Sequence, residues 1–127
     1  MPVIAELVSQ PSEQDLIDLS KTYEGHIEWL QTTLEGPDLV VGGRFNDRLV
    51  AAFVLVDEQS HWRLKRLQVR EITRRRGVAR QTLQSALKTL NIDKPVSVDL
   101  SAHPELQPLF EAVGFAPQQG RSLQWQP

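Results

Sequence analysis

The stretch Arg74-Arg75-Arg76-Gly77-Val78-Ala79 lies between a strand-like segment, residues 62–69, and an apolar stripe at helical spacing that continues to Leu90. The start of a helix leaves backbone N–H groups unpaired and carries partial positive charge. A glycine lets a ligand approach the backbone closely, and arginines add charge and paired donors for phosphate oxygens. Basic residues at a helix start oppose its dipole unless an anion binds there. This stretch therefore predicts a turn that holds a pyrophosphate.

Positive charge is concentrated around this turn. Residues 1–60 hold 3 basic and 11 acidic residues (net −8), residues 61–90 hold 9 and 1 (net +8), and residues 91–127 hold 2 and 4 (net −2). A nucleic-acid binder spreads its positive charge over a broad face and adds stacking aromatics, whereas Trp62 alone accompanies the arginines here. The distribution favours a small, strongly anionic ligand, and we expect no nucleic-acid partner.

Length and composition indicate one globular domain over residues 1–127, because the chain is long enough for a single core and too short for two. The absence of cysteine excludes disulfides, thiol catalysis and cysteine metal sites. No apolar run approaches the ~20 residues that span a bilayer, and the N-terminus has no signal-peptide pattern. We expect a cytoplasmic protein, monomeric when alone, with no membrane partner and no metal site.

The first third of the chain has the pattern of a strand followed by two helices. Residues 3–7 alternate weakly and predict a strand. Ser12, followed three residues later by Asp15, resembles a capping box and opens a helix that Gly25 breaks. Residues 27–34 predict a second, shorter helix.

The middle of the chain predicts an antiparallel meander. Residues 39–45 and 49–56 are strand-like, and Asn46-Asp47-Arg48 between them is rich in turn formers, which indicates a β-hairpin. After a second turn, residues 62–69 complete the meander as a third long strand.

Beyond the arginine-glycine turn, an amphipathic helix ends near Asn91. Residues 96–100 predict a buried strand parallel to a neighbour, because a helix precedes it as a crossover. Residues 106–113 predict a last helix, with Gly114 after its end and a closing strand or hairpin after Phe115. The predicted order is β-α-α-β-β-β-α-β-α-β, an α/β (α+β) fold with a mixed, mostly antiparallel sheet flanked by helices.

This order and motif resemble the GNAT (Gcn5-related N-acetyltransferase) superfamily over essentially the whole chain. Arg74, Gly77 and Ala79 match its acetyl-CoA motif, Gln/Arg-x-x-Gly-x-Gly/Ala. Leu67-Gln68-Val69 stands where the fourth strand of that fold presents backbone groups to the pantetheine arm, and Gly114-Phe115 matches its closing Gly-Phe pair. The resemblance implies the GNAT fold and acetyl-CoA or CoA as a bound ligand.

Within that superfamily, the chain resembles the PanZ/PanM family. The similar stretches are residues 14–19, 44–49 and 69–78, and Phe115 followed by Gln118-Gln119-Gly120. The resemblance implies association with aspartate α-decarboxylase and promotion of self-cleavage of its proenzyme to the pyruvoyl form. It also implies coupling of β-alanine and pantothenate synthesis to the level of CoA.

The expected coenzyme contacts combine main-chain groups of the strand with the turn and the helix start. Charge-assisted hydrogen bonds contribute roughly 1.5–3 kcal/mol each, so a few of them account for micromolar binding. The residues expected to bind coenzyme are Leu67, Gln68, Val69, Thr73, Arg74, Arg75, Arg76, Gly77, Val78, Ala79 and Arg80.

The resemblance to PanZ also suggests a partner surface at the hairpin turn, where Arg44 and Asn46 would face the decarboxylase. The alternative is an ordinary turn in which Phe45 packs inward. Trp29 and Trp125 lie in peripheral elements. Exposed tryptophan is enriched at binding hot spots, although burial in the core is the default for each.

The sequence points to no catalytic residue. Residues 62–69 contain no carboxylate that could act as the general base, and Phe110 stands where the superfamily commonly has a tyrosine acid. Glu71 is flanked by arginines and is expected to pair with them. Each of the three histidines is by default a surface or capping residue, and His103, which follows the fifth strand, is the one candidate for a place at the cleft. A non-catalytic coenzyme-binding regulator is therefore favoured, and the alternative is an active acetyltransferase for an amine or a protein N-terminus.

Overall fold

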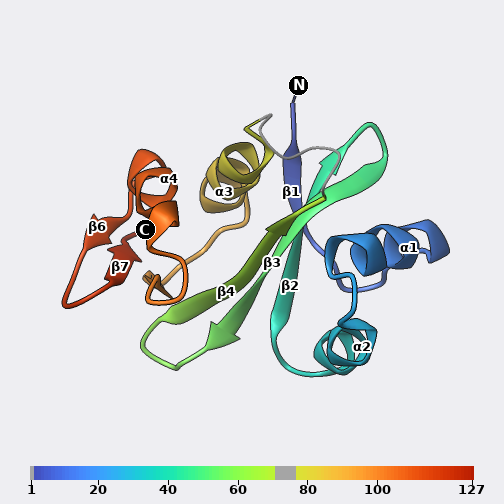
Figure 1. Ribbon diagram of the computed structural model, residues 1–127, viewed down its shortest axis with the longest axis horizontal. Helices are drawn as coiled ribbons and strands as arrows, with labels where there is room; N and C mark the ends of the chain where they lie inside the picture. Colours follow the sequence, from blue (N-terminus) through green and yellow to red (C-terminus); the bar gives the residue numbers. More distant parts are fainter. Residues whose placement is uncertain (1, 71–76) are drawn as a thin grey trace.

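The computed structural model describes residues 2–70 and 77–127. Within those residues, one mixed sheet has the strand order β1-β2-β3-β4-β5-β7-β6, and each neighbouring pair is antiparallel except β4 and β5 (Figure 1). The strands are β1 (Ile4–Leu7), β2 (Leu39–Phe45), β3 (Arg48–Asp57), β4 (Trp62–Val69), β5 (Val96–Asp99), β6 (Ala116–Pro117) and β7 (Ser122–Trp125). The predicted fold class is confirmed, including the parallel placement of β5.

Helices cover both faces of this sheet. Helices α1 (Glu13–Thr22) and α2 (Ile27–Glu35) lie on one face, and α3 (Val78–Thr89) and α4 (Gln107–Ala112) on the other (Figure 1). The capping box at the start of α1 is present: Ser12 Oγ accepts from Asp15 N–H at 3.0 Å, and Asp15 Oδ2 accepts from Ser12 N–H at 3.2 Å. Gly25 separates α1 from α2 in the left-handed conformation, at φ +84°.

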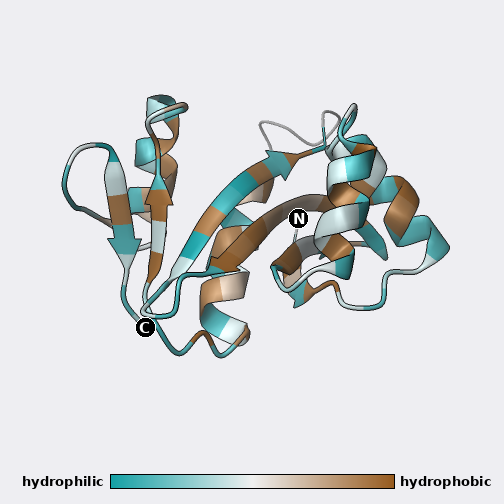
Figure 2. Ribbon diagram, turned by 90° about the horizontal axis from the view of Figure 1, so that it is seen from below, coloured by the Kyte–Doolittle hydropathy of each residue, from teal (hydrophilic) through white to brown (hydrophobic). Residues whose placement is uncertain are grey.

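Strand β3 contributes to all three hydrophobic clusters, and its residues 49–56, Leu-Val-Ala-Ala-Phe-Val-Leu-Val, are apolar throughout (Figure 2). Its successive residues point to opposite faces of the sheet. Ala52 and Val54 pack with Leu19 and Leu30 under α1 and α2, whereas Phe53 packs with a larger cluster under α3 and α4. A continuous apolar run is what a strand buried on both faces requires.

The hairpin between β2 and β3 turns through Asn46 and Asp47 alone. Both residues have positive φ, +47° and +67°, as a two-residue type I′ turn demands. The predicted hairpin is confirmed, but Arg48 pairs with Phe45 and therefore belongs to β3.

Edge strand β1 is secured to α3 by side chains one helical turn apart. The main-chain N–H of Val3 donates to Gln81 Oε1 at 3.0 Å, and that of Ala5 donates to Ser85 Oγ at 2.8 Å. Helix α3 lies so close to the sheet that a Cβ on Gly43 would stand 2.4 Å from Thr82 Oγ1. Exposed edge groups invite pairing with other chains, so these bonds also protect the edge.

The C-terminal quarter differs in detail from the prediction. The last helix begins as a 3₁₀ turn, η2 (Pro104–Leu106), before α4, and Gly114 follows its end at φ +104°. The closing segment is the hairpin of β6 and β7, so the observed order has one short strand more than the predicted string. In the described part of the chain, no helix is long and apolar enough to cross a membrane.

Candidate functional site

The parallel strands β4 and β5 separate partway along their length and leave a pocket between them. Their pairing joins Trp62, Arg63 and Leu64 to residues 96–98, and within the described residues it ends there. The pocket has a volume of about 430 Å³. Its walls are residues 63–68 of β4, residues 98–103 at and after β5, and Leu106 and Phe110 from the last helical segment.

A β-bulge in β4 lies beside this pocket. Lys65 pairs with Val54 and Gln68 with Ala52, so two residues of β4, Arg66 and Leu67, face one residue of β3. Arg66 adopts the left-handed conformation at φ +62°, which costs a non-glycine residue roughly 1–2 kcal/mol. A bulge bends its strand and increases its twist, which helps to turn β4 away from β5. Arginine has no special preference for this conformation, so the bulge could not be read from the sequence.

Helix α3 begins with main-chain N–H groups that no helical carbonyl accepts. The first bond within the helix runs from Gln81 N–H to Gly77 O at 3.0 Å, so the N–H groups of Val78, Ala79 and Arg80 precede the ladder. Gly77 is the N-cap residue at φ +69° and provides no side-chain cap. The first turn holds Arg80 and no acidic residue. This helix start is suited to an anion, with Val78 offering only its main chain because its side chain is buried.

The predicted coenzyme residues fall into three groups. Leu67, Gln68 and Val69 lie on β4 next to the bulge, and Leu67 and Gln68 line the pocket. Gly77, Val78, Ala79 and Arg80 form the start of α3, which packs beside β4 (Figure 1). The remaining residues, Thr73, Arg74, Arg75 and Arg76, lie outside the described residues, as does Glu71.

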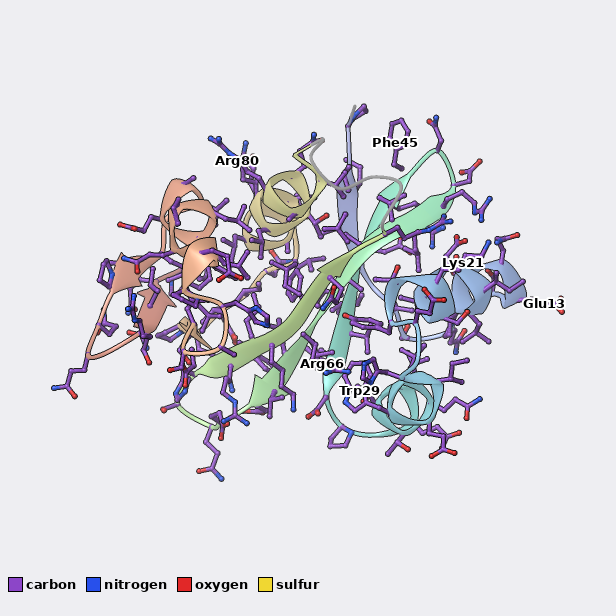
Figure 3. The ribbon with its side chains drawn as sticks, viewed as in Figure 1. Glu13, Lys21, Trp29, Phe45, Arg66 and Arg80 are labelled. Atoms are coloured by element: carbon purple, nitrogen blue, oxygen red, sulfur yellow. The ribbon has the colours of Figure 1, made fainter. Side chains whose placement is uncertain are left out.

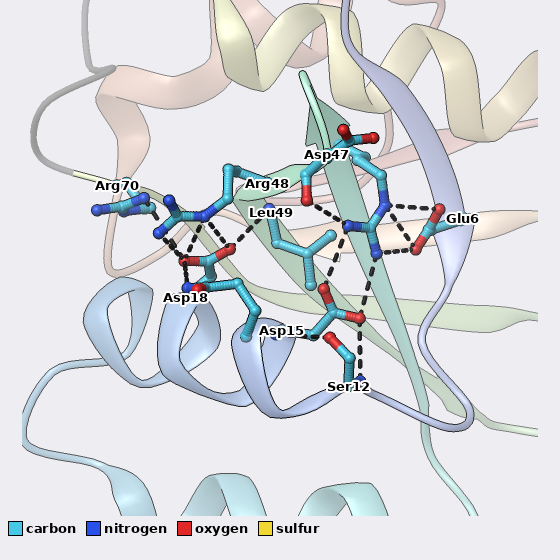
Figure 4. A network of polar contacts seen from close by, with 10 residues as sticks. Glu6, Ser12, Asp15, Asp18, Asp47, Arg48, Leu49 and Arg70 are labelled. Carbon is cyan, nitrogen blue, oxygen red and sulfur yellow. Dashed lines mark hydrogen bonds and ion pairs between the residues drawn. The ribbon is translucent and has the colours of Figure 1, made fainter.

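A buried carboxylate joins α1 to the start of β3 and to the residue that follows β4 (Figure 4). Asp18 is fully buried and accepts hydrogen bonds from Arg48 (2.6–3.1 Å) and from Leu49 N–H (3.2 Å). Arg70, the residue after β4, approaches the same carboxylate at 3.8 Å. Burial by itself would raise the pKa of Asp18, but the bonds from Arg48, Leu49 and Gln14 outweigh it and lower the pKa below its usual value.

The hairpin residues predicted to meet a partner have different surroundings. The Arg44 guanidinium bonds to the carboxylates of Glu6 (2.5–3.1 Å) and Asp15 (3.2 Å) and to the carbonyl of Asp47 (2.9 Å) (Figure 4). Arg44 therefore has a structural role in joining β1, α1 and the turn. Asn46 is exposed at the tip of the hairpin. Contact of either residue with a partner stays a prediction.

Phe45 and the three tryptophans differ in how they pack. Phe45 is half-buried against Val3, Val50, Ala51 and Val78, as in the alternative of an ordinary turn. The partly buried Trp62 and Trp125 pack on the larger core, whereas Trp29 lies over the core beneath α1 and α2.

The polar groups of the pocket are mostly cationic or already paired. Arg63 and Lys65 line the β4 side, as does Arg66, although its guanidinium lies against the ring of Trp29. Asp99 accepts bonds from Ser101 Oγ (2.6 Å) and Ser101 N–H (2.9 Å), which lower the pKa of its carboxyl. His103 lines the pocket, with Nδ1 3.2 Å from Glu105 Oε1.

Two features of the pocket bear on proton transfer. Sequence reasoning missed Asp99 and Ser101, which join the site only because β5 lies beside β4. Phe110 is buried against Phe115, with ring centroids 5.1 Å apart, and has no proton to donate. Neither the paired Asp99 nor the apolar ring of Phe110 is suited to proton transfer in this pocket.

A mixed sheet that opens between two parallel strands, with helices on both faces, defines the chain as a GNAT-fold protein. The solution structure of YhhK from Escherichia coli, a candidate N-acetyltransferase with coenzyme A bound, is 28% identical and has a TM-score of 0.70, with each chain fully covered. A crystal structure of a Bacillus subtilis acetyltransferase in complex with CoA has a TM-score of 0.67 at 18% identity, covering 98% of this chain and 99% of that one, and it supports the fold alone.

The family within this class follows from the sequence comparisons. The model of the acetyltransferase (GNAT) domain PanZ matches residues 2–123. The chain is 32% identical over 114 residues to the PanD regulatory factor of Escherichia coli K12, which covers 86% of this chain and 87% of that protein. The chain belongs to the PanZ family of GNAT domains.

Proposed function

We propose that this protein binds coenzyme A or acetyl-CoA in the pocket between β4 and β5 and, in that form, regulates aspartate α-decarboxylase. The observation that carries the proposal is the opening of the two parallel strands around a pocket of about 430 Å³ in a chain of the PanZ family. Its relatives support it, because the similar YhhK structure holds coenzyme A and the Escherichia coli relative is named a PanD regulatory factor.

The main chain of β4 supports a role for Leu67 and Val69 in holding the pantetheine arm. The N–H of Arg70 donates to Val50 O on the β3 side at 2.8 Å. Main-chain groups alternate between the two edges of a regular strand, so those of Val69 are directed toward the β5 side, and Leu67, in the bulge, lines the pocket. A pantetheine arm has amide groups that can pair with such an edge as an added strand would.

The start of α3 supports binding of the pyrophosphate. The N–H groups of Val78, Ala79 and Arg80 are the donors available there, and Gly77 adds no side chain between them and a ligand. Thr73 and the three arginines, residues 74–76, are proposed to complete this cradle on the strength of the motif alone.

The residues of the pocket support binding over acetyl transfer. A general base works best when its pKa lies near the working pH, whereas the pKa of Asp99 is lowered by its bonds to Ser101. Phe110 offers no acid for the leaving thiolate. The proposed role is therefore to sense the coenzyme and to act on the decarboxylase proenzyme by association, with Arg44 and Asn46 on the proposed contact surface.

Calorimetry and a cleavage assay together test this function. The purified protein should bind CoA and acetyl-CoA with micromolar affinity, and mixing it with the decarboxylase proenzyme should accelerate self-cleavage, measured by intact mass. Acceleration should depend on added coenzyme, with the proenzyme plus coenzyme alone as the control. Absence of binding heat with both ligands contradicts the coenzyme role, and unchanged cleavage in the presence of bound coenzyme contradicts the regulatory one.

A further inference from the structure

The β-bulge of β4 is held by residues from the opposite side of the sheet. Tyr23, at the end of α1, is 2% exposed, and its Oη donates a hydrogen bond of 2.7 Å to the main-chain oxygen of Arg66. The two residues are 43 positions apart in the sequence. Burial raises the pKa of the Tyr23 phenol above its usual value, so the hydroxyl remains a donor at neutral pH.

The side chain of Arg66 is held by the same layer. Its guanidinium carbon lies 4.2 Å from the ring centroid of Trp29, on α2, in a cation–π contact (Figure 3). Trp29 in turn meets Tyr23 edge to face, with centroids 5.0 Å apart at 68°. Tyr23 and Trp29 therefore fix both the main chain and the side chain of the one β4 residue in the left-handed conformation.

Helix α1 also reaches the other end of the same strand segment. Asp18 approaches Arg70 at 3.8 Å, whereas Tyr23, at the end of the same helix, bonds to Arg66. Residues 67–69, between these two anchor points, include Leu67 and Gln68 of the pocket wall. A change in how α1 sits on the sheet would therefore move this wall.

A left-handed arginine persists only where its surroundings hold it in place. The alternative to the bulge is regular pairing of β4 with β3, which would shift every residue beyond the bulge by one position. A one-residue shift turns each side chain to the other face of a strand. Leu67 and Gln68 would then present different groups to the pocket.

We infer that Tyr23 and Trp29 are positioning residues for coenzyme binding: they act through Arg66 to keep the β4 bulge, and thereby the pocket, in its binding geometry. This inference rests on the proposed function. Neither residue is among those that line the pocket, so both influence the affinity for coenzyme from the far face of the sheet. The layer of α1 and α2 is thus coupled to the coenzyme pocket through one backbone oxygen and one guanidinium.

The test compares coenzyme affinity in Tyr23→Phe, which removes only the hydroxyl, with that in Thr22→Val. Thr22 is the neighbouring residue, is also buried, and donates its hydroxyl to Asp18 O inside α1 at 3.1 Å, so Thr22→Val loses a buried hydroxyl bond without touching β4. We expect Tyr23→Phe to weaken CoA binding about fivefold, the equivalent of one neutral hydrogen bond, and Thr22→Val to leave it unchanged. Calorimetry measures the affinity, and urea unfolding checks that both variants fold.

A second variant separates positioning from simple packing. Glycine adopts the left-handed conformation without strain, so Arg66→Gly should reduce the dependence of the bulge on Tyr23. Tyr23→Phe should then weaken CoA binding less than twofold in the Arg66→Gly background. Trp29→Leu, which removes the ring beneath the guanidinium, should weaken CoA binding in the Arg66 background only.

The outcomes are distinct from those of the proposed function. If the unmodified protein fails to bind CoA, the proposed function and this inference both fall. If it binds CoA and Tyr23→Phe binds equally well, or the fivefold loss persists with Arg66→Gly, the inference alone is overturned.

Discussion

Replacement of Gly77 by alanine separates the two reasons for a glycine at the start of α3. One reason is conformational, because Gly77 has φ +69° and ψ +17°, a left-handed conformation that costs other residues roughly 1–2 kcal/mol. The other reason is access, because a ligand phosphate would have to approach this backbone closely. The described residues contribute no steric cost, since the nearest of their atoms to the added Cβ would be Gln81 Nε2 at 4.0 Å.

The two reasons predict different sizes of effect in two assays. Unfolding in urea should show a loss of about 1 kcal/mol for Gly77→Ala, since the smaller entropy of the unfolded alanine chain offsets part of the strain. Loss of one charge-assisted hydrogen bond to phosphate removes about 1.5–3 kcal/mol, so CoA affinity measured by calorimetry should fall roughly 10-fold to 150-fold.

Gly120→Ala is the matched control, because Gly120 is also left-handed, at φ +63°, and its Cβ would meet nothing within 4 Å. It lies between β6 and β7, the two strands at the edge of the sheet beyond β5. Gly120→Ala should therefore show a similar loss of stability and no loss of CoA affinity. If Gly77→Ala binds CoA as tightly as Gly120→Ala does, the pyrophosphate does not approach the start of α3, and the reasoning from the arginine-glycine turn is refuted.

Three further predictions concern the framework of the site. Asp18→Ala should lower the free energy of unfolding by about 3 kcal/mol, the lower end for breaking a buried ion pair, since it leaves Leu49 N–H buried without its acceptor. Urea titration checks this beside Asp93→Ala, an exposed control whose free energy of unfolding should stay within about 0.5 kcal/mol of that of the unmodified protein. Gly43→Ala should cost about 1–3 kcal/mol, because its Cβ would stand 2.4 Å from Thr82 Oγ1, and a thermal melt indistinguishable from that of the unmodified protein would contradict the close approach of α3. The pKa of Asp18 is lower in the folded protein than its unfolded value of about 3.9, so its contribution to stability is complete above that value and is lost as the pH falls through the lower folded pKa. Unfolding measured from pH 7 down to about pH 2.5 should show this loss, and a slope unaltered in Asp18→Ala would count against it.

Local patterns in the sequence predicted most of the framework. Three local signals predicted structure that is observed in the fold. They are the capping box of Ser12 and Asp15, the turn at Asn46-Asp47 and the apolar helical stripe after Gly77. The regularity of these signals explains why the predicted bounds of most elements differ from the observed ones by only one or two residues. The closing hairpin was harder to place, because a two-residue strand such as β6 carries no periodicity.

Interactions between distant segments could not be predicted in the same way. No pattern near Tyr23 in the sequence predicts its hydrogen bond to Arg66. Likewise, no pattern near Asp18 predicts its ion pairs with Arg48 and Arg70. Arg44 reads as a free basic residue at a turn, yet the fold places Glu6 and Asp15 around it. Such contacts depend on which strands become neighbours, which is decided by the packing of the entire core.

The sequence by itself determined the family and the order of elements apart from the short strand β6, and it predicted a pyrophosphate turn, because these depend on spacing along the chain. Only the tertiary structure decided how β4 departs from β5, that Arg66 forms a bulge, and that Asp99 and Ser101 face the same pocket. The physical reason is that a pocket is made where pairing between strands ends. That point depends on cross-strand register and on the bond from a distant helix, neither of which is encoded in the residues of β4 alone.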